Sequence, residues 1–129
     1  MHRGLRKPNE QIVIMTISEP FDIEREPLEI VSEAYTMLGG ITEPFFLIYD
    51  APRLPLSPND LVNAWADYRF SHGEGREFDK YGRMIVVSND EVARLGARIG
   101  QHLYPGKDIR TFDTVEEAVD YARAALAKR

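Results

Sequence analysis

The sequence predicts an α/β fold with a mainly parallel sheet of four to five strands and about four helices. Short apolar runs alternate with longer stretches whose apolar residues recur at helical spacing. The alternation is repeated along 129 residues, a length typical of one domain. Because a helix between two strands joins them as parallel neighbours with a right-handed crossover, this pattern favours a parallel sheet.

Four segments are predicted to be strands. Residues 12–17 are rich in β-branched side chains, and residues 45–49 and 84–87 are uninterrupted apolar runs. Uninterrupted runs are typical of strands that are covered on both faces. Residues 109–112 alternate between apolar and polar side chains, which predicts a strand at the edge of the sheet.

Each predicted strand is followed by a predicted helix. Pro27 fits the first turn of a helix that continues to residue 38 and ends at two glycines. Thr114 and Glu117 form a capping-box pattern at the start of the last helix. The other two predicted helices are residues 58–71, with Ser57 as N-cap, and a helix that begins at Asn89 or Asp90 and continues through His102.

Composition excludes several classes of function. The chain has no cysteine, which excludes a disulfide framework, thiol catalysis and cysteine-ligated zinc. Its net charge of −5 repels phosphates, so we expect no nucleic acid partner. No apolar run is long enough for a signal peptide or a transmembrane segment, and we expect a cytoplasmic protein. Residues 1–10 are basic and polar and are predicted to form a flexible N-terminal tail, with one domain over residues 11–129.

The second half of the chain carries a family resemblance. It contains Val-Val-Ser-Asn-Asp at 86–90, Ile-Arg-Thr-Phe at 109–112 and Asp-Thr-Val-Glu-Glu-Ala-Val at 113–119. This succession resembles the STAS/SpoIIAA-like group, which comprises anti-sigma-factor antagonists and uncharacterised bacterial relatives. The resemblance covers about residues 10–127. It implies a small SpoIIAA-like sheet with helices, no cofactor, and action through protein contacts.

The resemblance also implies a candidate phosphosite. In the antagonists, a partner kinase phosphorylates a Ser or Thr at the start of the helix that follows the Asp-ended strand. Ser57 is at the comparable place, although Leu56 precedes it where the family has Asp, and Pro58 follows it. A phosphate at a helix N-terminus would meet unpaired N–H groups. The alternative is an ordinary N-cap, for which Ser followed by Pro is well suited.

Further candidates form a predicted ligand or partner surface. Asp50 ends a strand, where open α/β sheets place their ligand sites. Trp65 and Tyr68 share one face of a predicted helix, and Arg76 and Tyr81 belong to a loop of mixed charge. The alternatives are a place in the core for the two helical aromatics and a plain surface loop for the others.

No catalytic motif, cofactor loop or metal-ligand spacing is present, so we predict no catalytic, cofactor-binding or metal-binding residues. The first functional hypothesis is a non-enzymatic STAS-like protein-interaction or regulatory module that also forms a homodimer. The small residues of one predicted helix face suggest the dimer; they are Ala93, Gly96, Ala97 and Gly100. The second hypothesis is a carrier of a small apolar or amphipathic ligand beneath residues 58–71. The third is an enzyme that uses Asp50 or His72.

Overall fold

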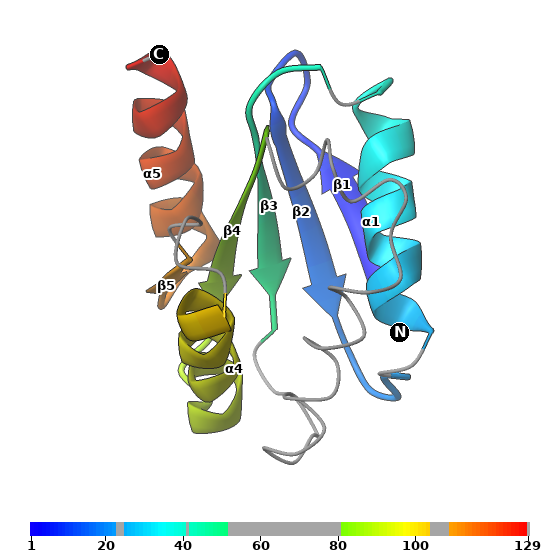
Figure 1. The fold of residues 1–129 in the computed structure, drawn as a ribbon, viewed down its shortest axis with the longest axis vertical. Helices are drawn as coiled ribbons and strands as arrows, with labels where there is room; N and C mark the ends of the chain where they lie inside the picture. Colours follow the sequence, from blue (N-terminus) through cyan, green and yellow to red (C-terminus); the bar gives the residue numbers. More distant parts are fainter. Residues whose placement is uncertain (23–24, 41, 52–80, 104–108, 129) are drawn as a thin grey trace.

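A computed structural model describes residues 1–22, 25–40, 42–51, 81–103 and 109–128. Five strands form one sheet in the order β1-β2-β3-β4-β5 (Figure 1). The antiparallel pairing of β1 with β2 is followed by three parallel pairings. The predicted mainly parallel sheet is therefore confirmed. The strands are β1 (His2–Arg6), β2 (Ile12–Ile17), β3 (Phe45–Asp50), β4 (Gly82–Val87) and β5 (Arg110–Phe112).

Three helices lie in the described part of the chain: α1 (Glu26–Met37), α4 (Glu91–Leu103) and α5 (Val115–Ala127). Helices α1 and α5 lie on opposite sides of the sheet, and α4 packs against β4 and β5 (Figure 1). The helix predicted over residues 58–71 lies outside the described residues. None of the described helices is long and apolar enough to cross a membrane.

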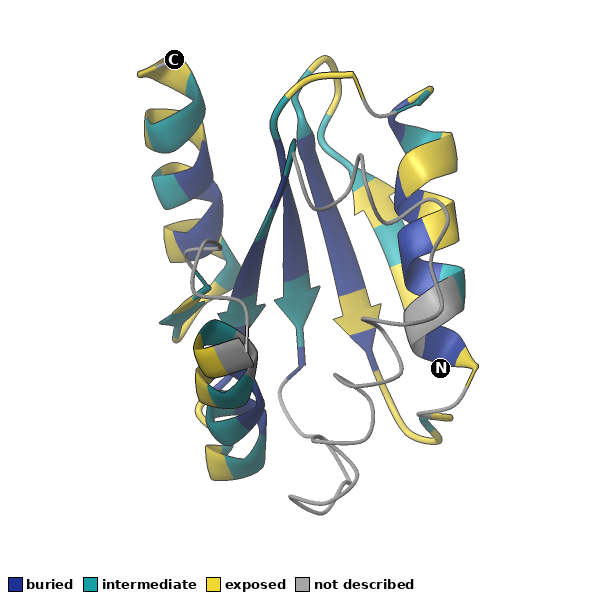
Figure 2. Cartoon of the chain, in the orientation of Figure 1, coloured by how far each residue is buried: buried dark blue, intermediate teal, exposed yellow. Residues whose placement is uncertain are grey.

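The core has two halves because successive side chains of a strand point to opposite faces. Val13 and Leu47 pack with Ile30 of α1, whereas Ile14 and Ile48 pack with Val119 of α5. Both faces of the central strands are thus covered, and Figure 2 shows the buried residues concentrated there. Coverage of both faces explains why these strands have uninterrupted apolar sequences.

Residues 1–10 were predicted to be a flexible tail, and that prediction is wrong, because His2–Arg6 forms strand β1 at the edge of the sheet. The pairing extends from His2 opposite Ile17 to Arg6 opposite Val13. The Arg6 guanidinium secures the far end by donating to the Met37 carbonyl over 3.1 Å. An edge strand can expose polar side chains to solvent, so its sequence need not show an apolar run.

The helix boundaries follow the start and stop signals of the sequence. At the end of α1, Gly39 and Gly40 have φ angles of 68° and 102°, a conformation that glycine adopts at little cost. At the start of α5, the Thr114 hydroxyl accepts a hydrogen bond from the Glu117 amide over 3.2 Å, which confirms the predicted cap.

The small-residue face of α4 packs inside the chain. Ala93, Gly96 and Ala97 are buried, and α4 contacts β4 and β5. Small side chains let the helix approach the sheet closely, and this close packing offsets the low helix propensity of glycine. A partner helix is not needed to explain these residues, so they no longer point to a dimer.

Candidate functional site at the carboxyl edge of the sheet

The carboxyl ends of β2, β3 and β4 meet at one edge of the sheet, since these strands are parallel neighbours. Open α/β sheets bind ligands at this edge. The N-terminus reaches the same edge, because antiparallel β1 begins where β2 ends (Figure 1). Polar side chains from three separate parts of the chain therefore gather there.

Asp50 is the last residue of β3 and lies at the centre of this edge, between Thr16 of β2 and Val87 of β4. Its side chain is half-buried, and burial raises the pKa of the carboxyl. No hydrogen bond or ion pair joins this carboxyl to another group in the described part of the chain. A half-buried carboxyl without a donor is available to a partner that supplies one.

The turn between β4 and α4 lies beside Asp50 and is held in place by hydrogen bonds. The buried Ser88 hydroxyl accepts a hydrogen bond from the Asp90 amide over 3.0 Å, and the Asp90 carboxylate caps α4 by accepting from the Val92 amide over 3.2 Å. Arg94 donates to the Ser88 carbonyl and pairs with Asp113 over 2.6 Å. These bonds occupy the polar groups of the turn and leave Asn89 exposed at the rim.

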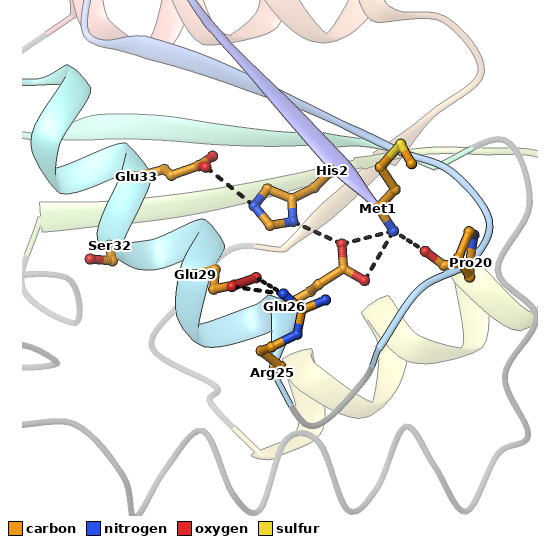
Figure 3. A pocket seen from close by; sticks show the side chains of 8 residues that line it. All are labelled: Met1, His2, Pro20, Arg25, Glu26, Glu29, Ser32 and Glu33. Atoms are coloured by element: carbon orange, nitrogen blue, oxygen red, sulfur yellow. Dashed lines mark hydrogen bonds and ion pairs between the residues drawn. The ribbon is translucent and has the colours of Figure 1, made fainter.

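A buried carboxylate, Glu26, lies at the other end of the edge. Its oxygens pair with the N-terminal ammonium of Met1 over 2.8 Å and with His2 Nδ1 over 2.9 Å, and they accept the Asp22 amide (Figure 3). Burial by itself would raise the pKa of Glu26. The hydrogen bonds from the ammonium, the amide and the imidazole outweigh burial and lower the pKa to about 2.

The groups around Glu26 line a shallow depression of about 570 Å³. His2 bridges two carboxylates, since its Nε2 lies 3.4 Å from Glu33, and Arg25 pairs with Glu29 over 3.1 Å (Figure 3). Within the described residues these groups are paired with one another. Within the described residues, no three metal-ligating side chains lie close enough to hold an ion. The lining consists of Met1, His2, Pro20, Arg25, Glu26, Glu29, Ser32 and Glu33.

The structure places two of the predicted surface residues, and it does not bring them together. Tyr81 directly precedes β4, whereas Asp50 ends the parallel strand β3. The register separates them by six residues along the strands, about 20 Å. Tyr81 packs against the core on the α1 side. The other predicted residues, Ser57, Trp65, Tyr68, Arg76 and His72, lie outside the described residues.

No observation in the described part of the chain supports the carrier hypothesis. Tyr49, an aromatic residue of β3, packs in the core beside α1, and burial raises the pKa of the Tyr49 phenol. The depression at Glu26 and a second one between β1 and α1 are lined largely by polar and charged side chains. An apolar ligand needs a mainly apolar wall.

The sequence did not indicate the Glu26 cluster. Its members lie about 25 positions apart and meet only because β1 pairs with β2. The burial of residues 2–6 alternates in the structure, where His2, Gly4 and Arg6 turn toward α1 while Arg3 and Leu5 are exposed. That period of two is typical of a strand.

Comparison with known proteins defines the class of fold. No protein-family model and no curated protein matches the sequence. A solved structure does: an uncharacterized protein of the DUF3478 family from Shewanella loihica PV-4, described as having a SpoIIAA-like fold. It is 20% identical, the match covers 95% of this chain and 92% of that chain, and the TM-score is 0.56. The chain therefore has a SpoIIAA-like α/β fold, as the sequence resemblance implied.

Proposed function

We propose that this chain is a non-enzymatic STAS-type regulatory module that binds a protein partner at the carboxyl edge of its sheet. The SpoIIAA-like fold supports the class of module. Since a fold does not define a function by itself, the site has to carry the proposal. The observation that carries it is the half-buried carboxyl of Asp50, which has no donor within the described residues and whose pKa is raised by burial.

The state of Asp50 indicates the chemistry of the partner. Burying a carboxylate without a donor costs stability, and a bound N–H group or cation would remove that cost. Natural proteins retain such unfavourable groups mainly where they function. We therefore expect the partner to place a backbone amide, a lysine or an arginine against Asp50. Exposed Asn89, on the fixed turn that follows β4, supplies a polar rim for the same contact.

Affinity capture tests this proposal. Asp50→Asn removes the charge, and Asp120→Asn makes the same chemical change at an exposed position of α5. We expect one protein to be captured from lysate by the parent chain and by D120N, and to be lost with D50N. If the three baits capture the same proteins, or if none captures a specific protein, the proposal is wrong.

Phosphorylation of Ser57 is a separate proposal, which rests on the family resemblance and on the position of this residue after Asp50 in the sequence. Mass spectrometry of the chain isolated from its own cells tests it. A phosphate on Ser57 that disappears in Ser57→Ala supports the proposal, and an unmodified residue under all growth conditions contradicts it.

A further inference from the structure

We propose that β1 is a docking edge on which an extended acidic segment of another protein pairs as a further strand. This inference rests on the proposed function as a binding module, but it concerns a second surface, the outer edge of β1, which lies two strands from Asp50. Main-chain hydrogen bonds to an exposed sheet edge provide affinity, and the alternating side chains provide specificity.

The backbone of β1 has groups directed toward the free edge. Met1 and Ser18 exchange two hydrogen bonds, of 3.0 Å and 2.8 Å, and the Lys7 amide donates to the Ile12 carbonyl over 3.0 Å. Because bonded and non-bonded pairs alternate in an antiparallel ladder, the odd-numbered residues of β1 face β2. The N–H and C=O groups of His2, Gly4 and Arg6 consequently face away from β2, and among the described residues β1 is the terminal strand of the sheet (Figure 1).

Beside these groups lie an exposed leucine, an exposed arginine and a half-buried lysine. Leu5 has 60% of its surface exposed. Arg3, two positions away on the same face, is exposed and has no hydrogen bond or ion pair within the described residues. Lys7 follows the strand directly, and β1 contains no acidic residue. A cation on each side of an exposed leucine therefore forms the outer face of the edge.

The positive charge of β1 determines which kind of strand can pair with it. Pairing two copies of β1 would place two basic strands side by side, and like charges on neighbouring strands are destabilising. A strand with acidic residues opposite Arg3 and Lys7 and an apolar residue opposite Leu5 is complementary to this face. An acidic extended segment is thus favoured over a second copy of this chain.

The opposite face of the edge has room for small polar side chains. A shallow groove of about 510 Å³ runs along the contact between β1 and α1, and Ser32 and Thr36 line it together with Gly4. A Cβ atom on Gly4 would come within 2.6 Å of the Met37 methyl, so glycine lets the helix approach the strand here. Since Glu33 also lines the groove, we expect Ser or Thr on this face of the docked strand and acids only on the other.

Defined peptides test the inference without a cell lysate. The probe is a fluorescein-labelled peptide of sequence TETVTET, which presents both acids and the valine on one face, and the matched control is TKTVTKT. We expect fluorescence anisotropy to show binding of the acidic peptide only. Arg3→Glu should weaken that binding by at least about tenfold, whereas Arg98→Glu, at an exposed position of α4, should leave it unchanged.

Three results would overturn the inference: equal binding of both peptides, no binding of the acidic peptide, or an affinity that R3E leaves unchanged. A dimer in sedimentation experiments that Leu5→Lys converts to a monomer would also overturn it, because a second copy would then occupy the edge. Capture that depends on Asp50 is measured separately. If capture succeeds while the peptides fail, the docking edge is wrong and the proposed function stands.

Discussion

At the scale of single residues, two carboxyl groups at one edge of the sheet have opposite environments. Glu26 is buried among three donors, and its pKa is lowered to about 2, whereas burial raises the pKa of the Asp50 carboxyl, which has no donor among the described residues. Environments that separate the pKa values of neighbouring acids often separate their roles. We assign Glu26 to the stability of the fold and Asp50 to binding.

The sequence could predict one of these residues and not the other. Asp50 follows an apolar run, so its place at a strand end could be inferred from neighbouring residues alone. The role of Glu26 depends on His2 and on the Met1 amine, which reach it only through the pairing of β1. Contacts across such sequence separations leave no local pattern.

The first prediction concerns Glu26→Gln. The variant loses charge-assisted hydrogen bonds, so its free energy of unfolding at pH 7 should fall by about 2 kcal/mol. A lowered pKa in the folded state means that the unfolded state binds more protons between pH 4.5 and about 2. The parent should therefore lose stability as pH falls through this window, and its advantage over E26Q should shrink. Urea denaturation at a series of pH values measures the stability of the parent and of E26Q. A stability difference between the two proteins that stays constant with pH would contradict the assignment of Glu26 to the stability of the fold.

At the scale of elements, helices were predictable to within about one residue where a start or stop signal was present. Pro27 and the glycine pair bounded α1, and Thr114 marked the start of α5. Strand β1 was missed because HRGLR contains neither an apolar run nor a turn signal that separates it from a tail. Edge strands are stabilised by their neighbours rather than by their own composition.

The second prediction concerns the cap of α5. Thr114→Ala leaves the Glu117 amide without its acceptor and should cost about 1 kcal/mol of unfolding free energy. Thr36→Ala is the matched control, since Thr36 lies in the last turn of α1 and its hydroxyl donates to the Ser32 carbonyl of the same helix. That substitution should change stability by less than about 0.5 kcal/mol because alanine favours helices. Equal effects of the two substitutions in denaturant melts would argue against the cap.

At the scale of the whole molecule, the parallel pairing of β2 to β5 could be predicted because strands alternate with helices in the sequence. The antiparallel start of the sheet could not, since nothing in residues 2–6 specifies on which side of β2 they pair. The turn that follows Arg6 contacts α5, because Glu10 in this turn forms an ion pair with Arg123 of α5 over 2.8 Å. Strand β1 thus connects to α5 through this turn and to α1 through Glu26.

The third prediction follows from this connection. Deleting residues 2–6 removes five ladder pairs and separates Glu26 from His2. We expect the free energy of unfolding to fall by about 3 kcal/mol or more, a large part of the stability of a typical domain. A deletion variant with an unchanged denaturation midpoint would behave as if these residues were a tail and would contradict the fold described here.

The most direct test of the binding site is the pH dependence of stability in Asp50→Asn, measured beside its capture of a partner. Because burial raises the pKa of Asp50, the ionised carboxyl destabilises the parent as pH rises above about 3.8. D50N should therefore be more stable than the parent at pH 7, equally stable at low pH, and unable to retain the partner. A variant that is less stable at pH 7, or that still captures the partner, would contradict the assignment of Asp50 to binding.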